Sequence, residues 1–201
     1  MARELQELGP MVSAQATLTQ TFTATLMRSY LGEAYGWTLD AFSSNALYVN
    51  SVNPDPTTAV NRWNIEAPED MDIRAGDYIL AIFGEEGSTE SLAAGLEKGI
   101  TVEIMFQRPS MYHVTVCRMG ESLGMKLKHF PGASSVFIES TTIGAVSKQA
   151  PHVCEGDRIV AVNGVVSDAA ALLTALQASD ELRLRCTRKP LNDDFDDEDD
   201  M

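Results

Sequence analysis

Short apolar runs, separated by glycine, proline and asparagine, predict a chain built mainly of β-strands. Threonine alternates with other residues over 19–27, which favours a half-buried strand. Further strands are expected at 37–42, 47–52, 77–83, 100–106, 111–118, 125–130, 136–142, 157–162 and 181–187. Helical signals are fewer. They predict helices at 57–63, from a Ser88 cap through Leu96, at 143–150, and from a Ser167 or Asp168 cap to about 178.

The predicted elements occur twice in the same order. Residues 74–82 (RAGDYILAI) match 154–162 (CEGDRIVAV), and Ala34-Tyr-Gly-Trp37 falls over Ser122-Leu-Gly-Met125. A repeat of roughly 85 residues is too long for a solenoid and indicates two domains. We expect an N-terminal lead at 1–17, domains at 18–108 and 111–189, and an acidic tail at 190–201. The short connection at 107–110 suggests a fixed mutual orientation.

Charge narrows the range of partners. The formal net charge is −14, which argues against nucleic acid or an anionic membrane as the main partner. No run approaches the ~20 apolar residues that a membrane helix needs, so no direct membrane insertion is expected. Seven acids lie within 193–200, and such a like-charge block is expected to be disordered. The three cysteines lack metal-ligand spacing and are typical of reduced thiols in a cytoplasmic protein.

The sequence contains no convincing catalytic motif. His113, His129 and His152 have no serine or cysteine nucleophile in a glycine-rich elbow nearby. Gly-Glu-Ser-Leu-Gly at 120–124 mimics a lipase elbow, but that motif needs a helix after the serine and a strand is predicted there. His113 and Cys117 could share a strand face, yet two ligands do not make a metal site. We expect a protein that is not an enzyme and has no cofactor and no metal.

One loop has binding chemistry. Gly124 lets the backbone turn so that successive N–H groups point one way, which makes a small anion-binding nest. Leu123 and Met125 flank it as apolar walls, and Arg118 lies four positions before Ser122. An anion cradle beside an apolar pocket suits the free C-terminus of a peptide that ends in an apolar residue.

The second half carries a more specific pattern. Gly-Asp-Arg-Ile-Val-Ala-Val-Asn-Gly at 156–164, preceded by Gly144-Ala-Val146 and Pro151, resembles the central signature of PDZ domains. The first half resembles a more divergent copy, with Gly84-Glu-Glu-Gly87 in place of the Asn-Gly turn. The resemblance implies a mainly β, α+β fold with two PDZ-like domains. Each would be a partly open antiparallel β-barrel with two helices.

The resemblance also implies a binding mode, in which a peptide C-terminus adds as an antiparallel strand to an open sheet edge. The N–H groups of Leu123, Gly124 and Met125 would hold the carboxylate, and Arg118 would help through an ordered water. The full set of expected peptide-binding residues is Arg118, Ser122, Leu123, Gly124, Met125, Lys126, Leu127, Lys128, Ala169, Leu173 and Leu176.

Individual positions suggest ligand preferences. Ala169, at the first position of the helix wall, predicts an apolar third-from-last ligand residue, because a hydroxyl there would be buried unpaired at ~1–3 kcal/mol. If the alignment is one residue out, Asp168 would favour a donor instead. Lys126 and Lys128 would favour acidic ligand residues upstream. The alternative is that Leu123 and its neighbours are plain core residues of a sheet that has lost its ligand.

The first half offers a possible second groove at Ala34, Tyr35, Gly36, Trp37 and Leu39. Trp37 is bulky enough to fill that pocket, and the position four before Ala34 is Tyr30, not a basic residue. The stretch 53–75 is long for the family. Its Trp63 either packs against that lengthened loop or forms a partner surface or a contact between domains.

These observations favour a scaffold or adaptor that binds protein partners by apolar C-termini, at membranes only through those partners. The alternative is a structural subunit that uses PDZ-like folds without binding free C-termini. Met201 stands behind a run of acids, so self-association through the chain's own tail is also possible.

Overall fold

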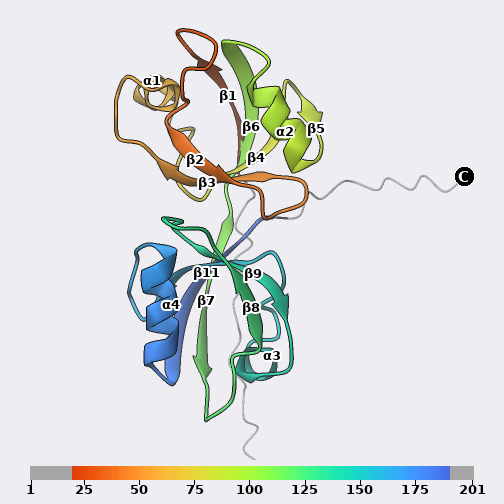
Figure 1. The fold of residues 1–201 in the computed structure, drawn as a ribbon, viewed down its shortest axis with the longest axis vertical. Coiled ribbons are helices and arrows are strands. Elements are labelled where there is room, and N and C mark those ends of the chain that lie inside the picture. Colours follow the sequence, from red (N-terminus) through yellow and green to blue (C-terminus); the bar gives the residue numbers. More distant parts are fainter. Residues whose placement is uncertain (1–19, 191–201) are drawn as a thin grey trace, which may run out of the picture.

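The computed structural model describes residues 20–190, and these form two units, each built around one open antiparallel sheet (Figure 1). The first unit has six strands: β1 (Thr21–Met27), β2 (Trp37–Asp40), β3 (Leu47–Val52), β4 (Tyr78–Ile82), β5 (Glu85–Glu86) and β6 (Thr101–Gln107). Its helices are α1 (Ala59–Glu66) and α2 (Thr89–Leu96). The second unit has β7 (Ser110–Cys117), β8 (Met125–Lys128), β9 (Val136–Thr141), β10 (Arg158–Val162) and β11 (Glu181–Arg188), with α3 (Ala145–Gln149) and α4 (Ala169–Ala178).

The two sheets have the same topology. The strand order is β1-β6-β4-β3-β2 in the first unit and β7-β11-β10-β9-β8 in the second, with β5 attached to β4. The expected fold class is confirmed: mainly β, with two unclosed sheets and four helices. Both β2 and β8 are therefore edge strands at equivalent places. The expected lead at 1–17 and nearly all of the acidic tail lie outside the described residues.

Hydrogen bonds at the Gly-Asp signature explain the matching halves. Asp157 accepts from the backbone N–H of Cys154 at 2.8 Å, and Asp77 accepts from that of Arg74 at 2.8 Å. In each unit the sheet arginine that follows, Arg188 or Arg108, contacts the same carboxylate. Burial raises the pKa of Asp77 to about 6, opposed by the hydrogen bond from Arg74. The aspartate thus fixes the turn that begins β4 and β10.

The turn after the fourth strand differs less than its sequence suggests. Asn163 and Gly164 have φ values of 49° and 83°, which is the left-handed pair that a tight hairpin requires. Phe83 and Gly84 take the same pair at 54° and 75°. The first unit therefore keeps this turn with phenylalanine in place of asparagine, and its short strand β5 follows, which the sequence analysis did not predict.

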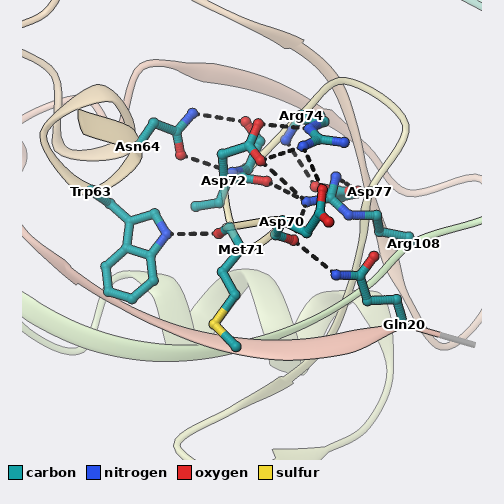
Figure 2. Close-up of polar contacts among 10 residues, drawn as sticks. Gln20, Trp63, Asn64, Asp70, Met71, Asp72, Arg74, Asp77 and Arg108 are labelled. Carbon is teal, nitrogen blue, oxygen red and sulfur yellow. Dashed lines mark hydrogen bonds and ion pairs between the residues drawn. The ribbon is translucent and has the colours of Figure 1, made fainter. Parts of the chain in front are cut away.

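The long stretch 53–75 is held against α1. The Trp63 indole N–H donates to the Met71 carbonyl at 3.0 Å, while the Asn64 side chain bonds both the N–H and the carbonyl of Ile73 at 2.8 Å. Figure 2 shows these contacts on one side of the loop and the ion pairs of Arg74 and its neighbours on the other. Of the roles considered for Trp63, the structure supports packing against the lengthened loop.

The units meet at a buried ion pair. Arg158, at the start of β10, donates two hydrogen bonds to the Asp40 carboxylate at the end of β2, at 2.6 and 2.8 Å. The exposed side-chain fractions are 1% for Arg158 and 3% for Asp40. Asn50 also donates to Asp40 at 2.9 Å, and the Arg158 guanidinium lies 3.6 Å from the centre of the Tyr48 ring.

Apolar contacts surround this pair. The Phe42 ring of the first unit lies 5.6 Å from that of Phe137 and 6.3 Å from that of Phe130, both in the second unit. Only two residues separate Gln107 of β6 from Ser110 of β7. In Figure 1 the units stack end to end, with β2 and β3 above the ends of β9 and β11. A charged pair buried between the units supports the expectation of a fixed mutual orientation.

Candidate functional site

The loop before β8 directs its N–H groups to one side. The carbonyls of Ser122, Leu123 and Gly124 accept from the N–H groups of Ala145 (2.9 Å), Val146 (3.1 Å) and Thr142 (2.7 Å), which lie in the β9–α3 turn and the first residues of α3. A trans peptide unit holds its carbonyl and its N–H on opposite sides. The N–H groups of Leu123, Gly124 and Met125 therefore point away from that turn. Within the described residues, no acceptor is found for those of Leu123 and Gly124.

Gly124 is required where it stands. Its φ of 74° lies in the left-handed region, and an added Cβ would lie 2.6 Å from the Thr142 carbonyl oxygen. The same Cβ would lie 2.9 Å from Cα of Gly144. Gly124 and Gly144 thus let the backbone of the loop contact the backbone at the start of α3. This contact fixes the loop carbonyls, and with them the direction of the N–H groups.

Apolar side chains lie beside the loop. Leu123, Met125 and Leu127 are partly buried and pack on the core of the second unit, as does Leu173 of α4. Ala169 and Leu176 are almost fully buried, at 1% and 3% exposure. In Figure 1, α4 lies to the left of β8 in this unit. We call the four partly buried residues, Leu123, Met125, Leu127 and Leu173, the β8–α4 surface. Among the described strands β8 pairs only with β9, so its other edge has no strand partner.

Arg118 adds a cation near this loop. Its backbone N–H donates to the Asp180 carbonyl at 2.9 Å, and its guanidinium donates to the Leu176 carbonyl near the end of α4. Within the described part of the chain it pairs with no carboxylate, and its Nε is buried without a hydrogen-bond partner. In a chain of net charge −14 an arginine without an acidic partner is a favourable neighbour for an incoming carboxylate.

The helix start answers one open point of alignment. Asp168 is the N-cap of α4, and its carboxylate accepts from the Ala171 N–H at 2.9 Å. Ala169 is the first helical residue and is buried. Asp168 is therefore engaged in capping, and Ala169 offers a methyl group alone.

The two rim lysines are less available than expected. Lys126 lies 2.7 Å from Glu139, and Lys128 pairs with the other oxygen of the same carboxylate. Hydrogen bonds from Lys126 and Lys128 lower the pKa of Glu139. One carboxylate thus neutralises half of the lysine charge, which weakens the expected preference for acidic ligand residues.

The first unit has a counterpart of Arg118 that the sequence analysis missed. Arg28 donates its backbone N–H to the Ile100 carbonyl at 2.6 Å and its guanidinium to the Leu96 carbonyl at 3.2 Å. These contacts match those of Arg118 with Asp180 and Leu176. Arg28 stands six positions before Ala34 because this loop is two residues longer. The position four before Ala34 is Tyr30, as noted from the sequence, so counting by the spacing of the second unit did not lead to Arg28.

Aromatic side chains occupy the corresponding place in the first unit. Tyr35 is buried at 6% exposure, and its hydroxyl donates to the Leu96 carbonyl of α2 at 2.6 Å. The Trp37 ring stacks on that of Tyr35 at 5.1 Å, and Arg28 lies 4.6 Å from the centre of the Tyr35 ring. Leu39 packs on the same core. Tyr35 spans from the loop to the helix, where the sequence analysis had expected Trp37 to be the filling residue.

The loop of the first unit has its own version of the backbone contacts. Asn53 donates to the Gly36 carbonyl at 2.7 Å and Val60 to the Tyr35 carbonyl at 3.0 Å. A Cβ on Gly36, which follows Ala34 and Tyr35, would lie 2.4 Å from Thr58. The backbone of this loop therefore matches the second unit, and the difference lies in the side chains.

Tyr35→Phe is expected to lower the free energy of unfolding by about 0.5–1.5 kcal/mol, because it removes one buried hydrogen bond and little volume. Arg28 still satisfies the Leu96 carbonyl, which keeps the cost small. Urea unfolding would measure the change. Tyr30→Phe, at a tyrosine that is 64% exposed, is the matched control and should change stability by less than about 0.5 kcal/mol. Equal effects at both positions would contradict the role assigned to Tyr35.

Other chemistries were sought in the described residues. No group of three or more His, Cys, Asp or Glu side chains there could hold a metal ion. Nor does the described part contain a helix with the length and apolar character to cross a bilayer.

Comparisons with known proteins concern mainly the second unit. Residues 114–184 match the family model of the PDZ domain. No curated protein matches the chain by sequence. Similar solved structures include the crystal structure of MUPP1 PDZ4, at 20% identity over 41% of this chain and 79% of that chain, with a TM-score of 0.36.

Two further structures cover both units. The structure of INAD PDZ45 in complex with NG2 peptide has 15% identity, covers 86% of this chain and 91% of that chain, and has a TM-score of 0.37. The complex of INAD PDZ45 with NORPA CC-PBM has 13% identity, covers 86% and 93%, and has a TM-score of 0.39. These superpositions are loose. A PDZ domain is found at residues 114–184, a range that contains the loop, β8 and α4.

Proposed function

We propose that the second unit binds the C-terminal peptides of partner proteins and that the chain is a non-enzymatic adaptor. The supporting observation is the edge of β8, which has no partner among the described strands and follows a loop with two unmet N–H groups. A peptide that adds to this edge would extend the sheet by main-chain hydrogen bonds. Its carboxylate would lie at the N–H groups of Leu123, Gly124 and Met125.

The side chains of the β8–α4 surface support an apolar last residue in the ligand. Leu123, Met125 and Leu127 alternate along the strand and so share one face. Buried Ala169 supports an apolar third-from-last ligand residue, since it presents no hydrogen-bonding group. Arg118 would hold the carboxylate through its guanidinium or a bridging water.

We propose that the first unit is a divergent PDZ-like copy that binds no free C-terminus. Tyr35 and Trp37 take the positions that Leu123 and Met125 hold in the second unit, and Tyr35 already donates to the helix wall. This observation also favours the second candidate function, a structural subunit in which neither unit binds free C-termini.

Presenting a library of C-terminal peptides to the intact chain tests the adaptor proposal. We expect ligands with an apolar last residue. Amidation of that residue removes the carboxylate charge and hydrogen bonds worth ~1.5–3 kcal/mol, so the Kd should rise roughly tenfold to a hundredfold. Peptide binding that survives amidation, or no binding at all, would leave the structural subunit as the better account.

A pair of neighbouring substitutions locates the site. Leu173→Gln places an amide in the β8–α4 surface and should weaken peptide binding at least about tenfold, since ~1–3 kcal/mol is lost when a polar group is buried unpaired. Thr174→Gln changes the exposed next residue of α4 and should leave the Kd unchanged. Circular dichroism would verify that both variants fold. Equal loss in the two variants would argue against this surface.

A further inference from the structure

The outer face of the second sheet has a hollow of about 350 Å³, away from the β8–α4 surface. Its lining includes His113 and Thr115 of β7, Arg183 and Arg185 of β11, and Ala161 and Val166 around the β10 hairpin. His113 pairs with Arg185 and Thr115 with Arg183 across the antiparallel ladder. Directly paired residues point to the same side of a sheet, so these four side chains share one face.

This face combines apolar floor and positive charge. Val166 is 64% exposed and supplies the exposed apolar side chain of the hollow, while Val114, Ala161 and Leu184, which also line it, are buried. Arg183 contacts Glu181 at 3.3 Å, but that pair is 77% and 61% exposed and so contributes little. The ligand that fits is therefore an apolar side chain flanked by carboxylates.

The Arg185 side chain has no partner within the described part of the chain. Most arginines of the described chain contact a carboxylate, as Arg158 and Arg188 do. Arg185 is half-buried, its side chain makes no hydrogen bond or ion pair with residues 20–190, and its Nε is buried without an acceptor. An unmet buried donor on a cation is costly, and a carboxylate would relieve it. In a chain with 29 acidic and 15 basic residues, Arg185 and Arg118 are the arginines of the described part without a carboxylate contact, so Arg185 can pair with a negative charge on this face.

We infer that the chain's own segment Asn192-Asp-Asp-Phe-Asp-Asp197 docks in this hollow, with Phe195 on the apolar floor and the aspartates beside Arg185 and Arg183. The inference does not depend on the proposed peptide binding. It uses an internal phenylalanine and needs no free carboxylate.

The chain is long enough to return. β11 ends at Arg188, and Phe195 stands seven positions beyond it, which allows a span of up to ~23 Å. The way back along β11 from Arg188 to Leu184 is only ~13 Å at ~3.3 Å per residue. Pro190 and Asn192 are residues that favour a reversal of direction. Because the segment is tethered, its effective concentration is of millimolar order and a weak contact suffices.

The amide NMR spectrum of the full chain tests this docking. Phe195→Ser should shift the amide resonances of 113–115 and 183–185 by more than a line width and leave those of β8 unchanged. Arg185→Gln should move the resonances around Phe195. Raising NaCl from about 50 mM to about 500 mM should shift the 113–115 and 183–185 amides in the direction that Phe195→Ser does, because screening weakens the charge contacts.

Met201→Ser is the matched control, since it removes an apolar tail residue outside the docked segment. It should leave the spectrum of 113–115 and 183–185 unchanged. If Phe195→Ser does not move those resonances, the inference is overturned. Shifts of Leu123–Leu127 on Met201→Ser would overturn it in favour of the tail on the β8–α4 surface. Shifts that depend on protein concentration would overturn it in favour of docking on a second copy.

Discussion

Arg158→Ala is expected to lower the free energy of unfolding of the intact chain by about 3–5 kcal/mol. The guanidinium is buried between the units and makes two hydrogen bonds to Asp40. Removing it leaves the Asp40 carboxylate in a site where, among residues 20–190, Asn50 and the Phe42 N–H remain as donors. Burial opposes the charge on Arg158, yet its hydrogen bonds to Asp40 keep its pKa raised.

The chain can limit that cost in one way, by separating its units so that water reaches Asp40. Two further changes are then expected in Arg158→Ala. Urea unfolding changes from one transition to two, and the radius of gyration measured by small-angle X-ray scattering increases. The double variant, Asp40→Ala with Arg158→Ala, should cost less than the sum of the two single variants, because each single variant leaves a buried charge unpaired and the double variant leaves none.

Arg183→Ala is the matched control, because Arg183 lies on the next strand but is 77% exposed. It should change stability by less than about 0.5 kcal/mol. A loss below about 1 kcal/mol for Arg158→Ala, with one transition retained, would mean that the interface does not hold the units together.

Gly124→Ala is the second substitution with a large expected effect. The left-handed conformation costs a non-glycine residue ~1–2 kcal/mol, and the new methyl group would also collide with the Thr142 carbonyl and Gly144. The loop must open to relieve this contact. We expect a loss of about 2–4 kcal/mol in the second unit and loss of C-terminal peptide binding, because the N–H groups would no longer converge.

Gly120→Ala is the control that separates the cost of the left-handed backbone conformation from the cost of the steric clash. Gly120 lies in the same loop with a φ of 80°, but an added Cβ meets nothing within 4 Å. Its cost should be the conformational ~1–2 kcal/mol alone, with peptide binding retained. Urea unfolding and peptide titration of both variants give the comparison. Equal losses would contradict the close contact between Gly124 and the start of α3.

Periodicity and turn residues were sufficient to predict the element order. The strands at 47–52 and 136–142 and the capped helix after Asp168 depend on local signals, and the structure contains them within about two residues. α1 extends to Glu66, beyond the expected end at 63, because Asn64 is held by Ile73 from the lengthened loop. That tertiary contact leaves no local signal.

The loop conformation was predictable from local residues, because Gly124 marks the left-handed position between Leu123 and Met125. The start of α4 at Ala169 follows from the Asp168 cap. That these residues bind a peptide stays a prediction. Arg28 was missed because two extra loop residues shift the count, although its contacts match those of Arg118. From the sequence, Arg158 is predicted to be an ordinary strand residue. Its ion pair with Asp40, 118 positions away in the sequence, is seen only in the structure.

The contact between Asp40 and Arg158 holds the two units against each other, in addition to the short connection between β6 and β7. A ligand strand added to β8 would then leave the molecule along a constant direction relative to the first unit. The rest of the partner protein that carries this C-terminus would then be held at a set angle and distance from the first unit. Breaking the contact between Asp40 and Arg158 would change which two large partners can bind the chain at the same time. It would not change the affinity of either partner alone.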